Sequence, residues 1–291
     1  MSLEPLPSLI VTHPGSAHKD DFLAVCLLVA RYGAPVARRP PTAAELADPT
    51  ICVVDVGDEH CAERMNFDHH QFPREHPPTS SLSLVLQHQG RYEDARLLCA
   101  WLEPAEWLDA RGPQRTADWM GVSRETLERL NSPVDAALLR RFSLCSTLVP
   151  GALLYEVMRL VGAELLEHLT TARASIDWVA RHAELWKLEA RGEAFEVLFL
   201  PRIEPLPDDP STAMERYIRT AGQGERIAAL IYPDRRATGF GLARYSEHPK
   251  LDFCRVAAEP DVHFAHKSGF LCKTSATARE RLKELVCIAW G

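Results

Sequence analysis

The sequence predicts a mainly parallel α/β domain at the N-terminus, joined by a helical bridge to a smaller α+β domain. Apolar runs of strand length alternate with runs of helix length over the first 90 residues, which is typical of a parallel sheet covered on both faces. From about residue 192 the apolar runs have strand length and are separated by proline, glycine and charged turns. The chain has 291 residues, 46% of them hydrophobic, so it can bury two cores. We expect domains at 1–150 and 192–291 and a bridge at 151–191.

The N-terminal elements follow from length and composition. "SLIVT" (8–12) and "ICVVDVG" (51–57) are short and β-branched, as strands are. "DDFLAVCLLVARYG" (20–33) has the length of a helix, and "SSLSLVLQHQG" (80–90) opens with hydroxyl residues that can cap one. "PVARRP" (35–40) is interpreted as a proline-bounded turn.

Helices dominate the middle of the chain and strands its last third. Residues 91–130 predict several short helices, "NSPVDAALLRRFSL" (131–144) predicts a capped helix with Asp135 in its first turn, and 149–191 predicts long helices. The expected elements of the second domain are strands at "AFEVLFLP" (194–201), "RIAALIYP" (226–233) and "GFGLARY" (239–245), and a helix at "TARERLKELVCIAW" (277–290).

Composition excludes several classes of protein. The eight cysteines are scattered and never form C-x-x-C, so we expect buried thiols and neither a disulfide framework nor a zinc knuckle. No apolar run reaches membrane-spanning length and the N-terminus lacks the features of a signal peptide, so we expect a soluble cytoplasmic protein that does not contact a membrane. A net charge of −7 argues against nonspecific coating of nucleic acid. Residues 226–291 carry a balance of +4 and residues 1–225 a balance of −11, so the front suits cations and the back suits anions.

Polar clusters follow the predicted strands. "THPGSAHKDD" (12–21) comes directly after the first strand, Asp55 ends the second, and "DHH" occupies 68–70. Open α/β sheets bind ligands at the carboxyl ends of their strands, so these clusters predict a site. The alternative for the first cluster is an ordinary capped turn, with Ser16 or Asp20 as the N-cap and solvated histidines.

The residue types in these clusters predict a metal centre. Carboxylates and imidazoles without cysteine suit manganese, magnesium, iron or cobalt better than a structural zinc. One carboxylate can bridge two ions about 3.5 to 4 Å apart, an arrangement that serves phosphoryl displacement. Asp55 is the candidate bridge because it ends the predicted strand "ICVVDV", opposite the two histidine-rich loops.

These motifs also resemble a known family. "THPGSAHKDD", "VVDVG" and "FDHHQ" are similar to the motifs of the melanocyte-proliferating-gene (MYG) family, a branch of the DHH phosphoesterase superfamily. Near the C-terminus, "HFAHKSGFLCKT" (263–274) is similar to the family's His-x-Ser-Gly-Phe segment. The resemblance implies a two-domain phosphoesterase with a dinuclear metal centre in the first domain and substrate-binding groups in the second.

The resemblance also implies a set of metal ligands. We assign one ion to His13 and His18, a second ion to Asp20, His69 and Asp135, and the bridging position to Asp55. Two positions depart from the family's pattern. Leu138 and "LRR" stand where a further Asp and Asn-Gly usually follow the aspartate at 135, and Ala17 stands where the wider superfamily has an aspartate, so His18 takes that role.

Catalytic and substrate-binding residues complete the assignment. We expect His70 to act on the substrate as an acid or electrophile and Asp68 to orient a histidine ring, with a simple turn as the alternative for Asp68. The residues expected to hold a phosphate or nucleotide are Arg244, His266, Ser268, Gly269 and Lys273, and the alternative for them is a glycine turn with exposed basic residues.

The function predicted from these residues is that of a metal-dependent phosphoesterase with two divalent ions. Mn²⁺ is the first choice, with Mg²⁺, Fe²⁺ and Co²⁺ as alternatives. The substrate is the end of RNA or DNA, cleaved in an exonuclease-like reaction, or a small nucleotide; a homodimer is compatible with the sequence. Two other functions stay open: a metallohydrolase acting on amide or peptide bonds, and a non-enzymatic metal or nucleotide sensor.

Overall fold

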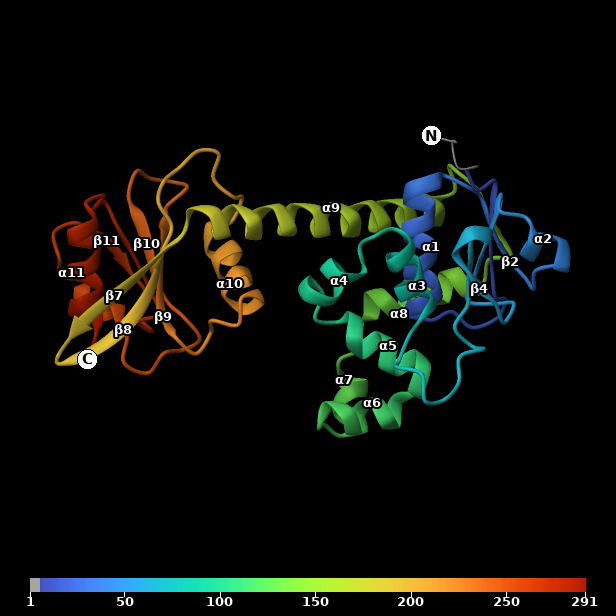
Figure 1. Ribbon diagram of the computed structural model, residues 1–291, viewed down its shortest axis with the longest axis horizontal. Coiled ribbons are helices and arrows are strands. Elements are labelled where there is room, and N and C mark those ends of the chain that lie inside the picture. Colours follow the sequence, from blue (N-terminus) through green and yellow to red (C-terminus); the bar gives the residue numbers. More distant parts are fainter. Residues whose placement is uncertain (1–5) are drawn as a thin grey trace. The chain divides into compact units, whose positions relative to one another are not determined.

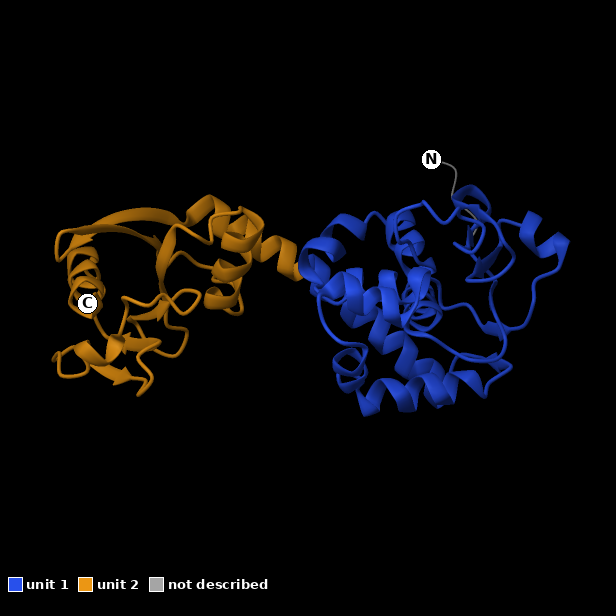
Figure 2. Cartoon of the chain, turned by 90° about the horizontal axis from the view of Figure 1, so that it is seen from below, with its two compact units in different colours: residues 1–170 blue, residues 171–291 orange. Residues whose placement is uncertain are grey.

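A computed structural model of the protein describes residues 6–291. The chain divides into two compact units, Met1–Thr170 and Thr171–Gly291 (Figures 1 and 2). The division lies inside helix α9, Leu153–His182, so the segment 151–191 that we assigned to a bridge belongs partly to each unit.

Unit 1 contains a mainly parallel six-stranded sheet in the order β4-β5-β3-β1-β2-β6 (Figure 1). Strands β5, β3, β1 and β2 are parallel, and the edge strands β4 and β6 run antiparallel to their neighbours. The strands are β1 Leu9–Thr12, β2 Val36–Arg38, β3 Ile51–Val54, β4 His60–Cys61, β5 Asn66–Phe67 and β6 Thr147–Leu148. The chain leaves β1 for β2 on one side and then crosses to β3 on the other, which creates a topological switch point beside β1.

Helices surround this sheet. Helix α1 is almost entirely apolar from Phe22 to Val29 and forms the centre of the first core. It ends at Gly33, which adopts the left-handed conformation that glycine tolerates best. The predicted short helices after residue 91 are present. The helices are α1 Lys19–Tyr32, α2 Ala43–Ala47, α3 Ser81–His88, α4 Tyr92–Leu98, α5 Leu102–Arg111, α6 Pro113–Met120, α7 Arg124–Arg129, α8 Pro133–Ser143 and the first part of α9, with a 3₁₀ turn at Ala62–Arg64.

Unit 2 is a second six-stranded sheet, in the order β11-β12-β10-β9-β8-β7, in which only β8 and β9 pair in parallel. Its elements are β7 Glu184–Ala190, β8 Glu193–Phe199, α10 Pro210–Thr220, β9 Ile227–Pro233, β10 Phe240–Arg244, a 3₁₀ turn at Phe253–Val256, β11 Val262–Ala265, β12 Leu271–Thr274 and α11 Arg279–Ala289. Alternate residues of β8 enter different cores: Val197 and Phe199 pack with α11, and Leu198 packs with α10. Together the two units confirm the mixed α/β fold class.

Two local predictions were wrong. Val36–Arg38 is strand β2 and not a turn, because its residues pair with Ile10, Val11 and Thr12 of β1. Residues 184–190 form strand β7 and not the end of a long helix. The burial along β7 alternates around Trp186, which is the period of a strand with one buried face. The partner strand of β2 lies much earlier in the sequence, so local sequence does not reveal the pairing. The composition of residues 184–190 is typical of a helix, which conceals strand β7.

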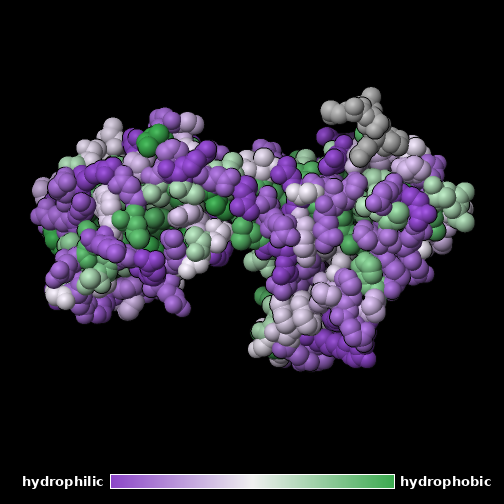
Figure 3. Space-filling view, in the orientation of Figure 1, coloured by the Kyte–Doolittle hydropathy of each residue, from purple (hydrophilic) through white to green (hydrophobic). Residues whose placement is uncertain are grey.

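The surface is largely hydrophilic on the face shown in Figure 3, and the prediction of buried thiols holds for four of the eight cysteines. Within residues 6–291, no helix is both apolar enough and long enough to span a bilayer. None of the eight cysteines forms a disulfide; Cys26, Cys52, Cys99 and Cys272 are buried, and the other four are partly exposed.

Candidate metal centre

Strands β1 and β3 deliver the first two polar clusters to one edge of the sheet. The strands are parallel neighbours in which Thr12 pairs with Val54, so His13 and Asp55 leave the sheet side by side. The imidazole Nε2 of His13 lies 3.5 Å from Oδ2 of Asp55. The topological switch point beside β1 therefore carries two of the predicted ligands.

Asp55 is held in an unusual conformation. Its φ of 57° lies in the left-handed region, which is uncommon for a residue other than glycine and often marks functional sites. The buried carboxylate accepts a hydrogen bond from Oγ of Ser81 at 3.1 Å, and the backbone N–H donates to the carbonyl of Phe67 at 3.1 Å. Backbone and side chain are thus fixed together.

The Asp-His-His segment follows β5, which pairs in parallel with β3, so it arrives at the same edge. Nε2 of His69 lies 3.2 Å from Oδ1 of Asp55. Nδ1 of His70 donates to Oδ1 of Asp68 at 2.6 Å, and the backbone N–H of Asp58 donates to the other carboxylate oxygen of Asp68 at 2.7 Å. Asp68 is buried and orients the ring of His70, whose side chain is 56% exposed.

Asp20 reaches the centre from the first turn of α1. Its carboxylate is buried and accepts hydrogen bonds from the backbone N–H groups of Ser81 at 2.9 Å and Leu82 at 2.7 Å. These groups belong to the start of α3, where a helix leaves N–H donors unpaired and favours negative charge. Neither Ser16 nor Asp20 is the N-cap of α1; His18 occupies that position.

A fourth carboxylate, Asp109 on α5, was not predicted from the sequence. Its Oδ2 lies 2.7 Å from Nε2 of His69. Three residues earlier on the same helix, buried Glu106 accepts hydrogen bonds from the hydroxyls of Ser83 at 2.6 Å and Tyr92 at 2.8 Å. Glu106 thereby fastens α5 to α3 and α4. The only hint in the sequence is a pair of acidic residues three apart on a short amphipathic helix.

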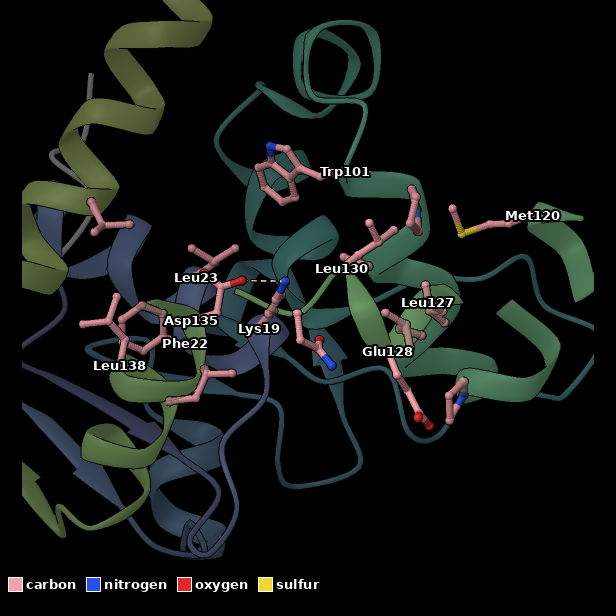
Figure 4. A pocket seen from close by; sticks show the side chains of 17 residues that line it. Lys19, Phe22, Leu23, Trp101, Met120, Leu127, Glu128, Leu130, Asp135 and Leu138 are labelled. Carbon is pink, nitrogen blue, oxygen red and sulfur yellow. Dashed lines mark ion pairs between the residues drawn. The ribbon is translucent and has the colours of Figure 1, made fainter. Parts of the chain in front are cut away.

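Asp135 and His18 lie outside the cluster. Asp135 forms an ion pair with Lys19, Oδ2 to Nζ 2.7 Å, on the wall of an apolar cavity of about 700 Å³ (Figure 4). The structure therefore does not bring Asp135 together with the other assigned residues, whereas it does bring Asp109 there. His18 is 58% exposed and its Nδ1 lies 3.8 Å from Oδ1 of Asp109, at the side of a second cavity of about 420 Å³.

The remaining side chains form three overlapping groups. Within each group the donor atoms lie within 4.8 Å of one another; the groups are Asp55, His69 and His70; Asp20, Asp55, His69 and Asp109; and His13, Asp21 and Asp55. Asp55 belongs to all three, as a bridging carboxylate would. Asp21 was not predicted, and it is also held by Arg38, Nη2 to Oδ2 3.4 Å, and by the backbone N–H of His18 at 2.6 Å.

Two buried nitrogen atoms support the fit of this cluster to cations. Nδ1 of His13 lies 2.9 Å from the carbonyl of Pro14, so Nε2 faces Asp21 at 3.2 Å and Asp55. The Nε2 atoms of His13 and His69 are buried, and neither contact with the carboxylates has hydrogen-bond geometry. A lone pair aimed at carboxylates requires a proton or a metal ion between them.

The pKa shifts agree with that interpretation. Contact with Asp21 raises the pKa of His13. Burial lowers the pKa of His69, but contacts with Asp109 and Asp55 outweigh the burial and raise it to about 10. Burial and the neighbouring carboxylates of Asp109 and Asp55 raise the pKa of Asp20 well above its usual range. The negative charge of the cluster therefore favours the binding of protons, and it would favour a metal cation for the same reason.

The predicted substrate-binding residues of unit 2 lie around the hairpin between β11 and β12. The backbone N–H of Ser268 donates to Nδ1 of His266 at 3.1 Å, and the ring of His266 packs 4.2 Å from that of Phe270. Gly269 has a φ of 68°, and a Cβ there would come within 2.0 Å of an Asp252 carboxylate oxygen. Glycine is therefore required for the shape of this hairpin.

The two predicted cations of unit 2 are already paired. Nζ of Lys273 lies 2.9 Å from Oδ2 of Asp234. The guanidinium of Arg244 pairs with Glu247 and donates to the carbonyl of Leu251 at 3.2 Å. These two side chains are held within unit 2 by local partners. In His266 the local hydrogen bond involves only Nδ1 and not Nε2, the other ring nitrogen.

One comparison with known proteins identifies part of the chain. Residues 9–96 match a family model named MYG1_exonuc, which is described as an uncharacterised protein family (UPF0160). The matched range contains His13, Asp20, Asp55 and the Asp-His-His segment, and ends before Asp109. A search of curated proteins finds no match.

Proposed function

We propose, on the premise that this chain belongs to the MYG1 family through residues 9–96, that it is a metal-dependent phosphoesterase. The family name points to exonuclease-like chemistry, which for this chain means removal of nucleotides from the ends of RNA or DNA, or cleavage of a small nucleotide. The observation that carries the proposal is the position of Asp55, which lies in all three groups of potential ligands.

The proposed ligand set differs from the sequence prediction in two ways: Asp109 takes the place of Asp135, and Asp21 is added as an alternative to His18. Asp20, His69 and Asp109 would hold one ion, His13 with Asp21 or His18 would hold the other, and Asp55, which belongs to all three groups, would contact both. Two divalent ions bound there, Mn²⁺ by first choice, would supply Lewis-acid stabilisation of a phosphoryl group and lower the pKa of a water.

His70 acts on the substrate in this proposal, and Asp68 orients its ring. His70 is half exposed beside the buried ligands, and its contact with Asp68 raises the pKa of the imidazole. A protonated His70 can donate to a phosphate oxygen or to the leaving group near neutral pH. Asp68 keeps Nδ1 protonated and turns Nε2 outward.

The hairpin of unit 2 supplies further substrate contacts. Because Nδ1 of His266 accepts from Ser268, its neutral ring carries the proton on Nε2, where it can donate to a phosphate. Ser268 and Gly269 shape this hairpin. Arg244 and Lys273 stay in the proposal, but each would have to exchange its present carboxylate partner for the substrate.

A direct assay tests the reaction class. Purified protein with Mn²⁺ should hydrolyse a nitrophenyl phosphodiester and a short oligonucleotide but not a peptide amide, and elemental analysis should find two ions per chain. Peptide hydrolysis without phosphodiester hydrolysis would favour the amide-bond hydrolase, and bound metal without any turnover would favour the sensor. Cytoplasmic location and a homodimer are proposals from the sequence alone; size-exclusion chromatography tests the second.

A further inference from the structure

A small polar cavity lies against the metal centre, on the side of His69, His70 and Asp109. Its volume is about 160 Å³. These three residues line it together with residues of the proline-rich segment 72–79 and with Arg111. The larger cavity beside Asp55 is also lined by His70 and Asp109, so the two cavities adjoin.

Arg111 is the arginine of unit 1 that lines this cavity. It lies at the end of α5, two residues after Asp109, and its guanidinium donates one hydrogen bond to the backbone carbonyl of His76. Lys19 and Arg38 each pair with an aspartate, but within residues 6–291 no carboxylate lies in ion-pair range of Arg111. A guanidinium carries five N–H donors, so Arg111 keeps donors and an uncompensated charge at this cavity.

The other polar groups of the cavity also suit an anion. His70 and His76 both line it, and Asp109 is its only carboxylate among the described lining residues. The ring of His76 stacks on Phe72 at 4.3 Å, and its Nδ1 lies 2.8 Å from the carbonyl of Pro77, which fixes the ring. Prolines 73 and 77 restrict the backbone of this segment. The cavity is thus a rigid polar site and not a loose gap.

We propose that this cavity binds a phosphate group of the substrate next to the one being cleaved, with Arg111 as its main partner. The inference rests on the proposed phosphoesterase function and narrows its substrate class to nucleotides or strand ends that carry a terminal phosphate. The cavity's small volume and polar walls suit a phosphate group better than a nucleoside, and an arginine fork matches two phosphate oxygens at once.

Paired substrates test the proposal kinetically. With Mn²⁺, the wild-type protein should cleave a dinucleotide carrying a 5′- or 3′-terminal phosphate with a KM about 10- to 100-fold below that of the same dinucleotide without it, the scale of hydrogen bonds to charged groups. Arg111→Ala should remove most of this preference while changing kcat on the unphosphorylated dinucleotide little. Arg111→Lys keeps the charge but loses the fork, so it should retain part of the preference. Arg115→Ala, an exposed change on α6, is the matched control.

Two outcomes would overturn the inference: no preference for either phosphorylated dinucleotide in the wild type, or a preference that survives Arg111→Ala. Thermal unfolding of each variant checks that losing the Arg111 contact with His76 has not destabilised the fold. A protein that cleaves neither dinucleotide would refute the proposed function and still leave the cavity open to a binding test. In calorimetry on the metal-free protein, adenosine monophosphate and inorganic phosphate should bind more tightly than adenosine through Arg111; equal binding to wild type and Arg111→Ala would overturn the phosphate site.

Discussion

Replacing Asp109 by asparagine tests whether Asp109, which the structure favours, or Asp135, which the sequence predicted, is a metal ligand. Asp109 lies 2.7 Å from His69 and shares a donor group with Asp20 and Asp55. Asparagine has the same size but removes the negative charge and one acceptor oxygen. The matched control is Asp135→Asn, which removes an equivalent charge that contacts Lys19 instead.

The expected magnitude follows from binding linkage. Changes to residues that only support metal ligands cost about 10- to 100-fold in metal affinity, so loss of a ligand should cost at least about 100-fold. At a Mn²⁺ concentration of about 100 times the wild-type Kd, bound metal stabilises the fold by about 2.7 kcal/mol; for a 100-fold weaker site the same concentration gives about 0.4 kcal/mol.

Thermal unfolding with Mn²⁺ and with EDTA measures this difference directly. Asp109→Asn should lose most of the increase in Tm that Mn²⁺ produces and should bind fewer ions per chain. Asp135→Asn should behave like the wild type in both measurements. A full Mn²⁺-induced increase in Asp109→Asn, or its loss in Asp135→Asn, would refute the assignment of Asp109.

Four further predictions concern the same centre. Asp55→Asn should abolish turnover and lower the metal content while the circular dichroism spectrum is kept, because asparagine tolerates the left-handed backbone; Asp118→Asn on exposed α6 should change neither. His70→Ala should lower kcat by about 10² to 10⁴-fold with its metal content unchanged, and loss of an ion would make His70 a ligand. Asp68→Asn should move the alkaline limb of the pH–rate profile to lower pH, since contact with Asp68 raises the pKa of His70; an unmoved limb would exclude His70 as the titrating acid. In EDTA, the free energy of unfolding should fall as pH rises toward 10, because the folded-state pKa of His69 is raised to about 10 and that stabilisation is complete only below its unfolded pKa; a flat profile in urea titrations would contradict this.

The ligands that follow strands could be predicted from the sequence. His69 was assigned from the residue types of the Asp-His-His segment and from the family resemblance, because strand β5 was not predicted. His13 and Asp55, in contrast, each come directly after a predicted apolar strand, and parallel neighbours bring their carboxyl ends to one edge. That inference needs only the period and order of the elements. It requires no knowledge of how the helices pack.

The ligand on a helix could not be predicted in the same way. Asp109 points into the centre because the buried side chain of Glu106 fastens α5 to Ser83 and Tyr92, contacts that exist only after tertiary packing. Asp135 was assigned from the family resemblance, and the capped helix predicted around it is present as α8. Packing of Phe142 against Phe22, with ring centroids 5.4 Å apart, accompanies a placement of α8 in which Asp135 meets Lys19 instead.

The carboxylates of this centre are stable in one place only when cations accompany them. Asp20, Asp55 and Asp109 approach one another with little solvent to screen them, and burying such charges is costly without compensation. In the metal-free protein, protons provide part of that compensation, which is why the pKa values of both His69 and Asp20 are raised. A divalent ion can also compensate the negative charge of the carboxylates. It then takes the place of the proton on Nε2 of His69. Metal uptake at this centre is therefore an exchange of protons for metal, and the affinity for the ion should rise with pH until His69 is neutral.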